Sequence, residues 1–344
     1  NALRGRRHPV IIVGHDAQRT GAGILLLALA KDIRDQGYDP LFLLVRAGPL
    51  LPEYQALGPT LILDEGWHLD GFRAAMNPSM PVIGSTCWSA PVLDALGHTS
   101  PEILLVHEMP AYIEQQGLAD SVSRARQVAV AMPGMVEALA EVLPTPTPIS
   151  VVQPGLITRR SSASERAHVQ ERLELSGTRS APVFIGAGYA DHRKGFDRFL
   201  HVSTLLHQRD PSAKFVWLGE ASEQARGEAN RALEAGLPLY TPGFQENPTA
   251  WYEQATVYLL TSRQDPGPTT VLDAARVGVP FVALDGDIGM RALGDLLDGV
   301  GTFTDSPAML VENALRLTKS ETPADRPRRA AHVEHLASRN NYAQ

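Results

Sequence analysis

Residues 10–45 read VIIVGHDAQRTGAGILLLALAKDIRDQGYDPLFLLV, and this stretch predicts the class of fold. Residues 10–13 form a short apolar run of the kind found in buried strands, and residues 41–45 form a second one. Between them, residues 23–36 have the apolar spacing of a helix, and Gly37 lies just past its end. A strand, a helix and a second strand in this order make a βαβ unit, which indicates a parallel sheet.

The same alternation continues along the chain. In the first half, further strands are predicted at residues 60–63, 81–84, 103–106, 127–131 and 149–152. After a polar stretch at residues 158–180, the second half has strands predicted at residues 183–185, 214–218, 237–240, 257–260 and 281–283. Runs that are apolar throughout are typical of strands buried on both faces of a parallel sheet. We therefore predict an α/β protein with two Rossmann-like domains that face a central cleft.

The length of 344 residues also favours two domains. We expect an N-terminal domain over residues 1–157, a C-terminal domain over residues 158–322, and a separate helical tail over residues 323–344.

Composition excludes several classes of protein. The chain is 44% hydrophobic and 20% charged, as globular proteins are, and its net charge of −7 argues against nucleic acid as a partner. The single cysteine, Cys87, excludes an intramolecular disulfide and a cysteine-based zinc cluster, and it fits a reducing compartment. The longest apolar run, residues 24–30, is too short to cross a bilayer, and no signal-peptide core follows the N-terminal arginines. We therefore expect a cytoplasmic protein.

Two segments of the first half place polar groups where open α/β sheets bind ligands, after the carboxyl ends of strands. The loop before the first helix contains Thr20, Gly21 and Ala22, and its N–H groups can bind a phosphate or a sugar hydroxyl. The third glycine of the dinucleotide fingerprint is absent, so an NAD site is not expected. His107 and Glu108 follow the strand at residues 103–106 and can bond to a sugar. The alternatives are glycines that only permit a tight turn and a histidine that only caps a loop.

The second half carries a basic loop after its first strand. This loop contains Gly188 and the adjacent cations Arg193 and Lys194, and a helix follows it. Glycines, cations and a helix N-terminus together can hold a pyrophosphate, although the loop is not a Walker A motif. A solvent-exposed pair of cations is the alternative.

Residues 262–275 read SRQDPGPTTVLDAA and are the most informative stretch of the second half. Pro268 suits the first turn of a helix, and Gly267 lets a ligand come close. The N–H groups expected to face an anion are those of Thr269, Thr270 and Val271. Asp265 at the start of the helix and Asp273 within it can accept bonds from sugar hydroxyls; capping alone explains Asp265 but not Asp273. Residues 285–287 read DGD and are interpreted as a turn, not as a metal site.

Taken in order, these segments resemble those of the retaining GT-B glycosyltransferases of family four over about residues 9–305. The loop of Thr20 is similar to the Gly-rich acceptor-side loop of that family, and His107 with Glu108 is similar to its histidine motif. Arg193-Lys194-Gly195 resembles the diphosphate-binding segment. Asp265 and Asp273 resemble the Glu-x7-Glu motif with both acids shortened. In two places the chain departs from the family: Gln153-Pro154-Gly155 lies where the family has Asn-Gly, and Gly188-Tyr189 lies where it has Arg.

The resemblance implies transfer of a hexosyl group from a nucleotide diphosphate sugar to a hydroxyl acceptor, with retention of the anomeric configuration and without a metal. It implies that the second domain holds the donor and the first holds the acceptor, and that His107, Asp265 and Lys194 are catalytic. The implied donor-binding residues are Gly188, Arg193, Lys194, Asp265, Gly267, Thr269, Thr270, Val271 and Asp273, and the acceptor-side residues are Thr20, Gly21, Ala22 and Glu108.

The implied acceptor is a glycan, a glycolipid or a small molecule, as in polysaccharide biosynthesis, and no cofactor is expected besides the nucleotide sugar as co-substrate. A cytoplasmic location includes the inner face of the membrane, and the sequence predicts no oligomeric state. Two other functions stay open. A nucleotide-sugar epimerase or hydrolase would act on the donor alone. A non-catalytic nucleotide-sugar-binding module would explain the two shortened acids.

Overall fold

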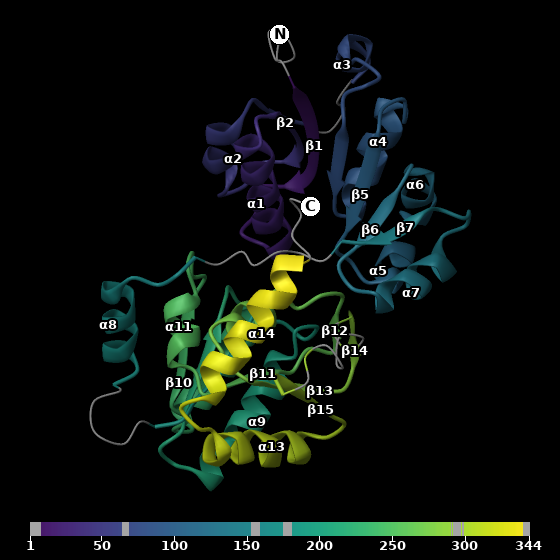
Figure 1. Cartoon of the computed structure of the whole chain (residues 1–344). Helices are drawn as coiled ribbons and strands as arrows, with labels where there is room; N and C mark the ends of the chain where they lie inside the picture. The colour runs from purple at the N-terminus through teal and green to yellow at the C-terminus, as the bar shows by residue number, and fades with distance from the viewer. Residues whose placement is uncertain are drawn as a thin grey trace. The chain divides into compact units, whose positions relative to one another are not determined.

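The computed structural model describes residues 8–63, 69–152, 159–174, 181–289, 291, 297 and 299–339. These residues form two compact units, unit 1 up to residue 152 and unit 2 from residue 159 to 339 (Figure 1). Each unit has its own parallel sheet, so the predicted α/β class with two Rossmann-like domains is confirmed. The predicted boundary at residues 157 and 158, and the segment Gln153-Pro154-Gly155, lie outside the described residues.

Unit 1 contains a seven-stranded sheet of order β3-β2-β1-β4-β5-β6-β7, in which every pair is parallel. Its strands are β1 (Pro9–Asp16), β2 (Asp39–Arg46), β3 (Thr60–Ile62), β4 (Val82–Ser85), β5 (Glu102–Val106), β6 (Val128–Val130) and β7 (Ile149–Val151). Its helices are α1 (Gly21–Asp35), α2 (Leu51–Leu57), α3 (Asp70–Ala75), the 3-10 turn η1 (Cys87–Ser89), α4 (Ala90–Leu96), α5 (Pro110–Gln115), α6 (Ala119–Arg124) and α7 (Gly134–Val142). All seven strands match the apolar runs of the sequence. The strand order reverses between β1 and β4.

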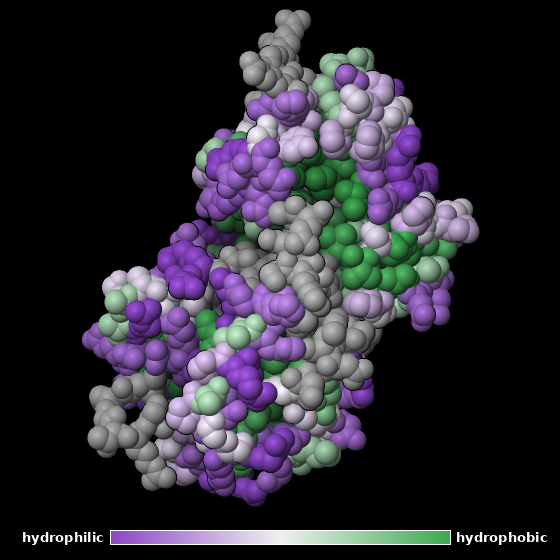
Figure 2. Space-filling view, in the orientation of Figure 1, coloured by the Kyte–Doolittle hydropathy of each residue, from purple (hydrophilic) through white to green (hydrophobic). Residues whose placement is uncertain are grey.

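The core of unit 1 forms around β1. Ile11, Ile12 and Val13 are fully buried, because neighbouring strands and helices cover both faces of the central strand. Leu26 of α1 and Tyr54 of α2 pack in one cluster with Ile12. On the face shown in Figure 2, hydrophobic residues gather near β5 and α5, whereas the outer surface of α2 is hydrophilic.

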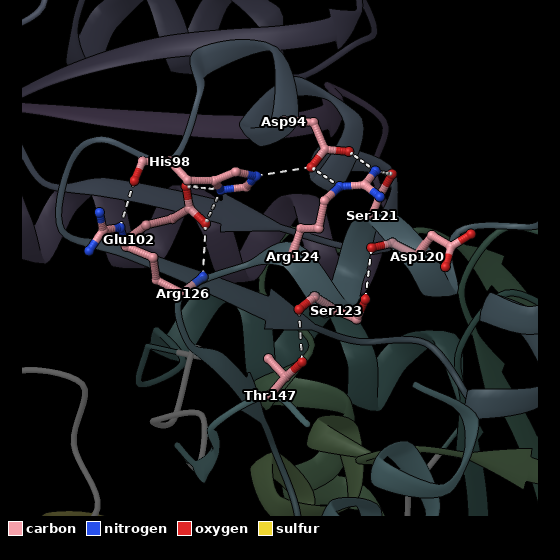
Figure 3. A network of polar contacts seen from close by, with 9 residues as sticks. All are labelled: Asp94, His98, Glu102, Asp120, Ser121, Ser123, Arg124, Arg126 and Thr147. Atoms are coloured by element: carbon pink, nitrogen blue, oxygen red, sulfur yellow. Dashed lines mark hydrogen bonds and ion pairs between the residues drawn. The ribbon is translucent and has the colours of Figure 1, made fainter. Parts of the chain in front are cut away.

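A polar network fastens the amino end of β5 (Figure 3). The His98 ring lies between two carboxylates, with Nε2 2.9 Å from Asp94 and Nδ1 3.0 Å from Glu102. Arg124 binds Asp94 through two nitrogens, at 2.9 and 2.5 Å, and the Arg126 N–H donates to Glu102 at 3.3 Å. These bonds join α4, α6 and β5 at the edge of the sheet opposite the carboxyl ends of its strands.

Unit 2 contains a six-stranded parallel sheet of order β10-β9-β8-β11-β13-β15. Its strands are β8 (Val183–Ala187), β9 (Lys214–Leu218), β10 (Leu239–Gly243), β11 (Val257–Leu260), β13 (Phe281–Leu284) and β15 (Gly301–Thr304), with the small pair β12 (Gln264–Asp265) and β14 (Asp287–Ile288). Its helices are α8 (Ala163–Arg172), α9 (Phe196–Arg209), α10 (Glu223–Glu234), α11 (Thr249–Gln254), α12 (Thr269–Arg276), α13 (Pro307–Ser320) and α14 (Asp325–Arg339). The sequence patterns predict neither β15 nor α13. The strand order reverses between β8 and β11.

Helix α14 packs against α12 and belongs to unit 2, which corrects the expectation of a separate tail. The Arg326 guanidinium donates to the carbonyls of Val277 and Tyr252, both at 2.9 Å, and Arg329 donates to the carbonyl of Gly278 at 2.8 Å. These carbonyls lie at the C-terminal ends of α11 and α12, where backbone acceptors lack partners within the helix. The two arginines therefore hold α12 in place. Among the described residues, no helix has the length and apolar character needed to cross a membrane.

Candidate functional site

The predicted site residues of unit 2 lie where the strand order of its sheet reverses. β8 and β11 are neighbours in the sheet but not consecutive in the chain, so the loops that follow them leave from the same edge. The first loop carries Gly188, Arg193 and Lys194, and the second carries Asp265 and Gly267. Such a reversal is where open α/β sheets bind ligands.

Gly195 lets these two loops approach each other. Its φ is +69°, and a Cβ at this position would lie 1.9 Å from the carbonyl oxygen of Thr261. The Thr261 hydroxyl donates to the Gly195 carbonyl at 2.9 Å. Any side chain here would push the loops apart, so the position requires glycine.

Lys194 and Asp265 form a direct ion pair, with 2.5 Å between Nζ and Oδ2. The aspartate side chain is 3% exposed and the lysine side chain is 17% exposed. The Ser262 hydroxyl and the Gly267 N–H also donate to this carboxylate, each at 3.3 Å. An ammonium group has three N–H bonds and this pair uses one of them, so Lys194 retains donors for an anion. The structure thus brings together two of the three residues expected to be catalytic.

Arg263, which sequence reasoning missed, joins the two loops. Its guanidinium makes two bonds of 2.7 Å to the Asp197 carboxylate at the start of α9 and a third bond of 2.7 Å to the His192 carbonyl. Its backbone N–H donates to the Arg193 carbonyl at 2.8 Å. The bonds from Arg263 lower the pKa of Asp197 below its usual value. A bidentate pair of this kind fixes geometry as well as charge, so Arg263 holds the two loops against each other.

Arg193 is exposed, and its guanidinium donates to the carbonyl of Gln264 at 3.1 Å. Gly188 has a φ of +133°, and its carbonyl accepts a bond of 3.0 Å from the Trp217 indole. Both residues therefore lie in the loop that presents Lys194. Their contact with a donor stays a prediction.

The N-terminus of α12 is partly satisfied by its own turn. The N–H of Thr269 donates to the Gly267 carbonyl at 2.9 Å, and the N–H of Val271 donates to the Pro268 carbonyl at 3.1 Å. The Thr270 hydroxyl lies 2.9 Å from a tyrosine hydroxyl of β11. Two of the three N–H groups expected to face an anion therefore have acceptors within the turn, and their contact with an anion stays a prediction.

Asp273 is buried in α12, with 6% of the residue exposed. Burial raises the pKa of the phenols of Tyr252 and Tyr258, and the negative charge of Asp273 adds to this shift. The carboxylate therefore lies near both rings, on the helix that the arginines of α14 hold in place. Its assignment to ribose hydroxyls stays a prediction.

In unit 1, the glycine loop starts α1. The Thr20 hydroxyl caps this helix by accepting a bond of 3.3 Å from the Gly23 N–H. Gly21 and Ala22 form the first turn, and a Cβ at Gly23 would lie 2.6 Å from the carbonyl oxygen of Gln18. Capping and close packing thus account for the loop as a turn. Binding of the acceptor by Thr20, Gly21 and Ala22 stays a prediction.

His107 and Glu108 follow β5 and face different partners. His107 Nε2 lies 3.2 Å from Ser85 Oγ at the end of β4, and burial lowers the pKa of His107 to about 4. The imidazole is therefore neutral at pH 7. The Glu108 carboxylate accepts bonds from the backbone N–H groups of Cys87 at 3.0 Å and His107 at 3.1 Å. Glu108 thus holds the turn η1, and its contact with an acceptor stays a prediction.

Three further residues of unit 1 escaped the sequence patterns. The rings of His15 and Trp88 are stacked, and the Trp88 indole donates to the Tyr112 hydroxyl.

Among the described residues, no group of three or more His, Cys, Asp or Glu side chains is arranged to hold a metal ion.

Comparison with known sequences points to one family. Residues 180–320 match the family Glycosyl transferases group 1. An uncharacterized glycosyltransferase of Haemophilus influenzae is 27% identical over 113 residues. That match covers 32% of this chain and 32% of the relative, so the similarity extends over about a third of each protein.

Solved structures extend the likeness to both units. HepE of Anabaena, in complex with UDP and glucose, gives a TM-score of 0.80 at 16% identity and covers 98% of this chain and 96% of that one. Sucrose-phosphate synthase of Thermosynechococcus elongatus gives 0.73 at 14% identity, with 97% and 95% covered. WaaG, a glycosyltransferase involved in lipopolysaccharide biosynthesis, gives 0.71 at 11% identity, with 96% and 95% covered. The fold is therefore that of the GT-B glycosyltransferases, as the sequence resemblance predicted, and unit 2 carries the match to Glycosyl transferases group 1.

Proposed function

We propose that this protein is a retaining glycosyltransferase that moves a hexosyl group from a nucleoside diphosphate sugar to a hydroxyl group of a glycan or glycolipid. The observation that carries the proposal is the ion pair of Lys194 and Asp265, because it lies at the strand-order reversal of unit 2 and inside the region that matches Glycosyl transferases group 1. HepE, which has the same fold, binds UDP and glucose and supports a nucleotide sugar as donor. We assign the donor to unit 2 and the acceptor to unit 1.

The role of Lys194 follows from the charge that develops in the reaction. As the bond between the anomeric carbon and the diphosphate oxygen breaks, negative charge builds up on the leaving diphosphate. Lys194 is already oriented by Asp265, so its ammonium group stabilises that charge without first reorganising. The side chains of Lys194 and the exposed Arg193 supply positive charge, and we therefore propose that the enzyme works without a metal ion.

The protonation state of His107 indicates its role in the reaction. Because this imidazole is neutral at pH 7, it serves as a hydrogen-bonding group for the reacting sugar and not as a charged acid. In a retaining transfer, the acceptor oxygen bonds to the anomeric carbon on the face that the diphosphate leaves. The acceptor proton then passes to the leaving phosphate oxygen. We place the reaction in the cytoplasm, including the inner face of the membrane, and in polysaccharide biosynthesis.

A donor screen tests the proposal. Calorimetry with UDP, GDP, ADP and dTDP identifies the nucleotide, and release of that nucleotide from its hexose conjugates is then measured with and without glycan acceptors. We expect acceptor-dependent release, a product with the donor's anomeric configuration by NMR, and full activity in EDTA. Equal release without an acceptor would indicate a hydrolase, and binding without transfer would indicate a binding module. Loss of activity in EDTA that Mn²⁺ restores would contradict the metal-independent mechanism.

The assignment of Asp273 has its own test. We expect Asp273→Asn to weaken binding of the ribonucleotide by roughly ten- to a hundredfold, because a charged acceptor of the ribose hydroxyls is lost. The 2′,3′-dideoxy nucleotide lacks those hydroxyls and should bind both proteins equally well. A variant with a lower melting temperature but an unchanged nucleotide affinity would show that Asp273 is only a structural residue of α12.

A further inference from the structure

The strand-order reversal of unit 1 also carries a group of side chains with a common chemistry. Gly14 of β1 pairs with Ser85 of β4, so the residues next along the chain lie side by side at the carboxyl ends of these two strands. His15 follows Gly14, and the turn η1 after Ser85 carries Trp88. The two rings are stacked, with centroids 5.4 Å apart and planes inclined by 16°.

The Trp88 side chain is half-buried, and a second contact besides the His15 stack fixes its ring. Its Nε1–H donates to the Tyr112 hydroxyl at 3.3 Å, and Tyr112 itself is 39% exposed. A hydroxyl that accepts a bond can still donate its own proton to a ligand. We call His15, Trp88 and Tyr112 the aromatic platform. In it, contacts with the other two residues fix the Trp88 ring, and Tyr112 adds an exposed ring with a hydroxyl group. Near α5, which carries Tyr112, Figure 2 shows hydrophobic residues at the surface of unit 1.

The backbone beneath this platform is strained. Thr86 has φ +75° and ψ 154°, a conformation that β-branched residues rarely adopt and that is found mostly at functional sites. Its hydroxyl is buried and has no hydrogen-bond partner among the described residues. The Glu108 carboxylate holds the strained turn through the N–H of Cys87. The turn that positions Trp88 is therefore strained at Thr86.

A carboxylate lies beside the platform and limits the ligands that fit. Asp16 is 3.3 Å from His15 Nδ1, and its side chain remains partly exposed. Carboxylates accept bonds from hydroxyl groups and repel phosphates and other anions. An aromatic surface beside a hydroxyl acceptor matches a pyranose ring, which has an apolar C–H face and a rim of hydroxyls. The Asp16 carboxylate also accepts a bond of 3.0 Å from the Gln18 N–H, and sugar hydroxyls can supply further donors to it, whereas an aliphatic chain cannot.

We propose that the aromatic platform binds a neutral sugar ring, and hence that the acceptor presents a sugar to unit 1. This inference rests on the proposed function for its place in the reaction. The binding itself follows from the platform alone.

The test is ligand-observed NMR on the full chain with methyl glycosides at millimolar concentration. We expect at least one methyl hexopyranoside to bind, and Trp88→Ala to weaken its binding by about tenfold, the loss typical of an aromatic anchor. Trp88→Phe should stay within about threefold of the wild type, because an aromatic ring remains. Tyr38→Ala is the matched control: it removes another exposed aromatic residue of unit 1, which precedes β2 at the opposite edge of the sheet, and it should change nothing.

Several outcomes would overturn the proposal. Binding that Asp265→Asn abolishes but Trp88→Ala does not would place the glycoside in unit 2. Equal binding of sorbitol, which lacks the ring, or of uridine would exclude recognition of a pyranose. Absence of binding by all methyl hexopyranosides would have the same meaning. If Trp88→Ala does not fold, then Tyr112→Ala, a change at the surface, decides in its place.

The proposed function is tested in the same sample by titration with UDP, GDP, ADP and dTDP. If none of them binds while the glycosides bind as expected, the proposed function fails and the platform stands. If a nucleotide binds and Trp88→Ala leaves glycoside binding unchanged, the platform fails and the proposed function stands.

Discussion

Replacing Lys194 by methionine removes one charge from a nearly buried ion pair and leaves the side-chain volume almost unchanged. We expect this variant to lose stability and also affinity for the nucleoside diphosphate. Asp265→Asn removes the other charge, and the double variant removes both. The three variants and the wild type form a thermodynamic cycle that isolates the interaction between the two side chains.

The magnitude follows from the burial of the two groups. Breaking a fully buried ion pair typically costs 3–5 kcal/mol, roughly, because the remaining charge keeps no counter-ion. Here the aspartate is 3% exposed, but the lysine is 17% exposed and two long bonds to Asp265 remain, from Ser262 and Gly267. We therefore expect about 2–3 kcal/mol for Lys194→Met, a similar loss for Asp265→Asn, and a double variant that is about 2 kcal/mol more stable than additivity predicts.

Urea denaturation gives the stabilities, and calorimetry with the bound nucleoside diphosphate and with its nucleoside gives the affinities. Lys194→Met should weaken binding of the nucleoside diphosphate by about ten- to a hundredfold and leave the affinity for the nucleoside unchanged. Lys214→Met is the control, because Lys214 is a similarly buried lysine of unit 2 that pairs with Glu174 at the other end of the sheet. Additive stabilities, or equal losses of affinity for both ligands, would refute the role of this pair.

Three other predictions follow from the contacts of single residues. Burial holds the pKa of His107 at about 4, below its usual 6.5, so the unfolded chain takes up a proton first as the pH falls. Between pH 7.5 and 5 the wild type should therefore lose about 2 kcal/mol more stability in urea than His107→Gln, and equal losses would contradict a half-buried imidazole that stays neutral. Arg263→Lys keeps the positive charge but loses the two parallel bonds to Asp197, so the affinity for the nucleoside diphosphate should fall several-fold in calorimetry. An unchanged affinity would show that binding does not depend on Arg263 holding the two loops together. His98→Gln should cost about 2 kcal/mol in urea without changing nucleotide affinity, because it leaves the buried Glu102 carboxylate without its hydrogen bond of 3.0 Å to the His98 ring; a neutral change would show that the network of Figure 3 adds no stability.

The fold could be predicted because its strands are buried on both faces. A strand such as β11 is apolar at every position, and burial of each of its four residues confirms the reason. β15 escaped prediction because Phe303 is the only large apolar residue among its four. The expectation of a separate tail rests on Pro323 and Pro327, which precede its predicted helix. Two arginines of α14, Arg326 and Arg329, lie against the ends of α11 and α12, where they satisfy backbone carbonyls.

The candidate site could be predicted only where one residue type suggests a chemistry by itself. The charge of Lys194 and Asp265 and their place after strands predict a role in binding, and the structure shows that their side chains form an ion pair. Arg263 and Asp197 look like ordinary surface charges in the sequence, because 66 residues separate them. No pattern predicts that a threonine adopts φ +75° at residue 86. That conformation depends on contacts of η1 that only the folded sheet provides.

Both units use the same topology to bring chemistry together, with different side chains. In unit 2, the loops after β8 and β11 meet through a charged pair, Lys194 with Asp265. In unit 1, the strands β1 and β4 occupy the corresponding places in the order of the sheet, and a stacked pair joins their carboxyl ends, with His15 at the end of β1 and Trp88 in the turn after β4. Charge suits a diphosphate and an aromatic surface suits a sugar ring, so the division of labour that we propose between the units follows from the side chains at the two reversals. On this reasoning, substitutions at the carboxyl ends of these strands should change which substrate binds, whereas the apolar strands themselves need not change.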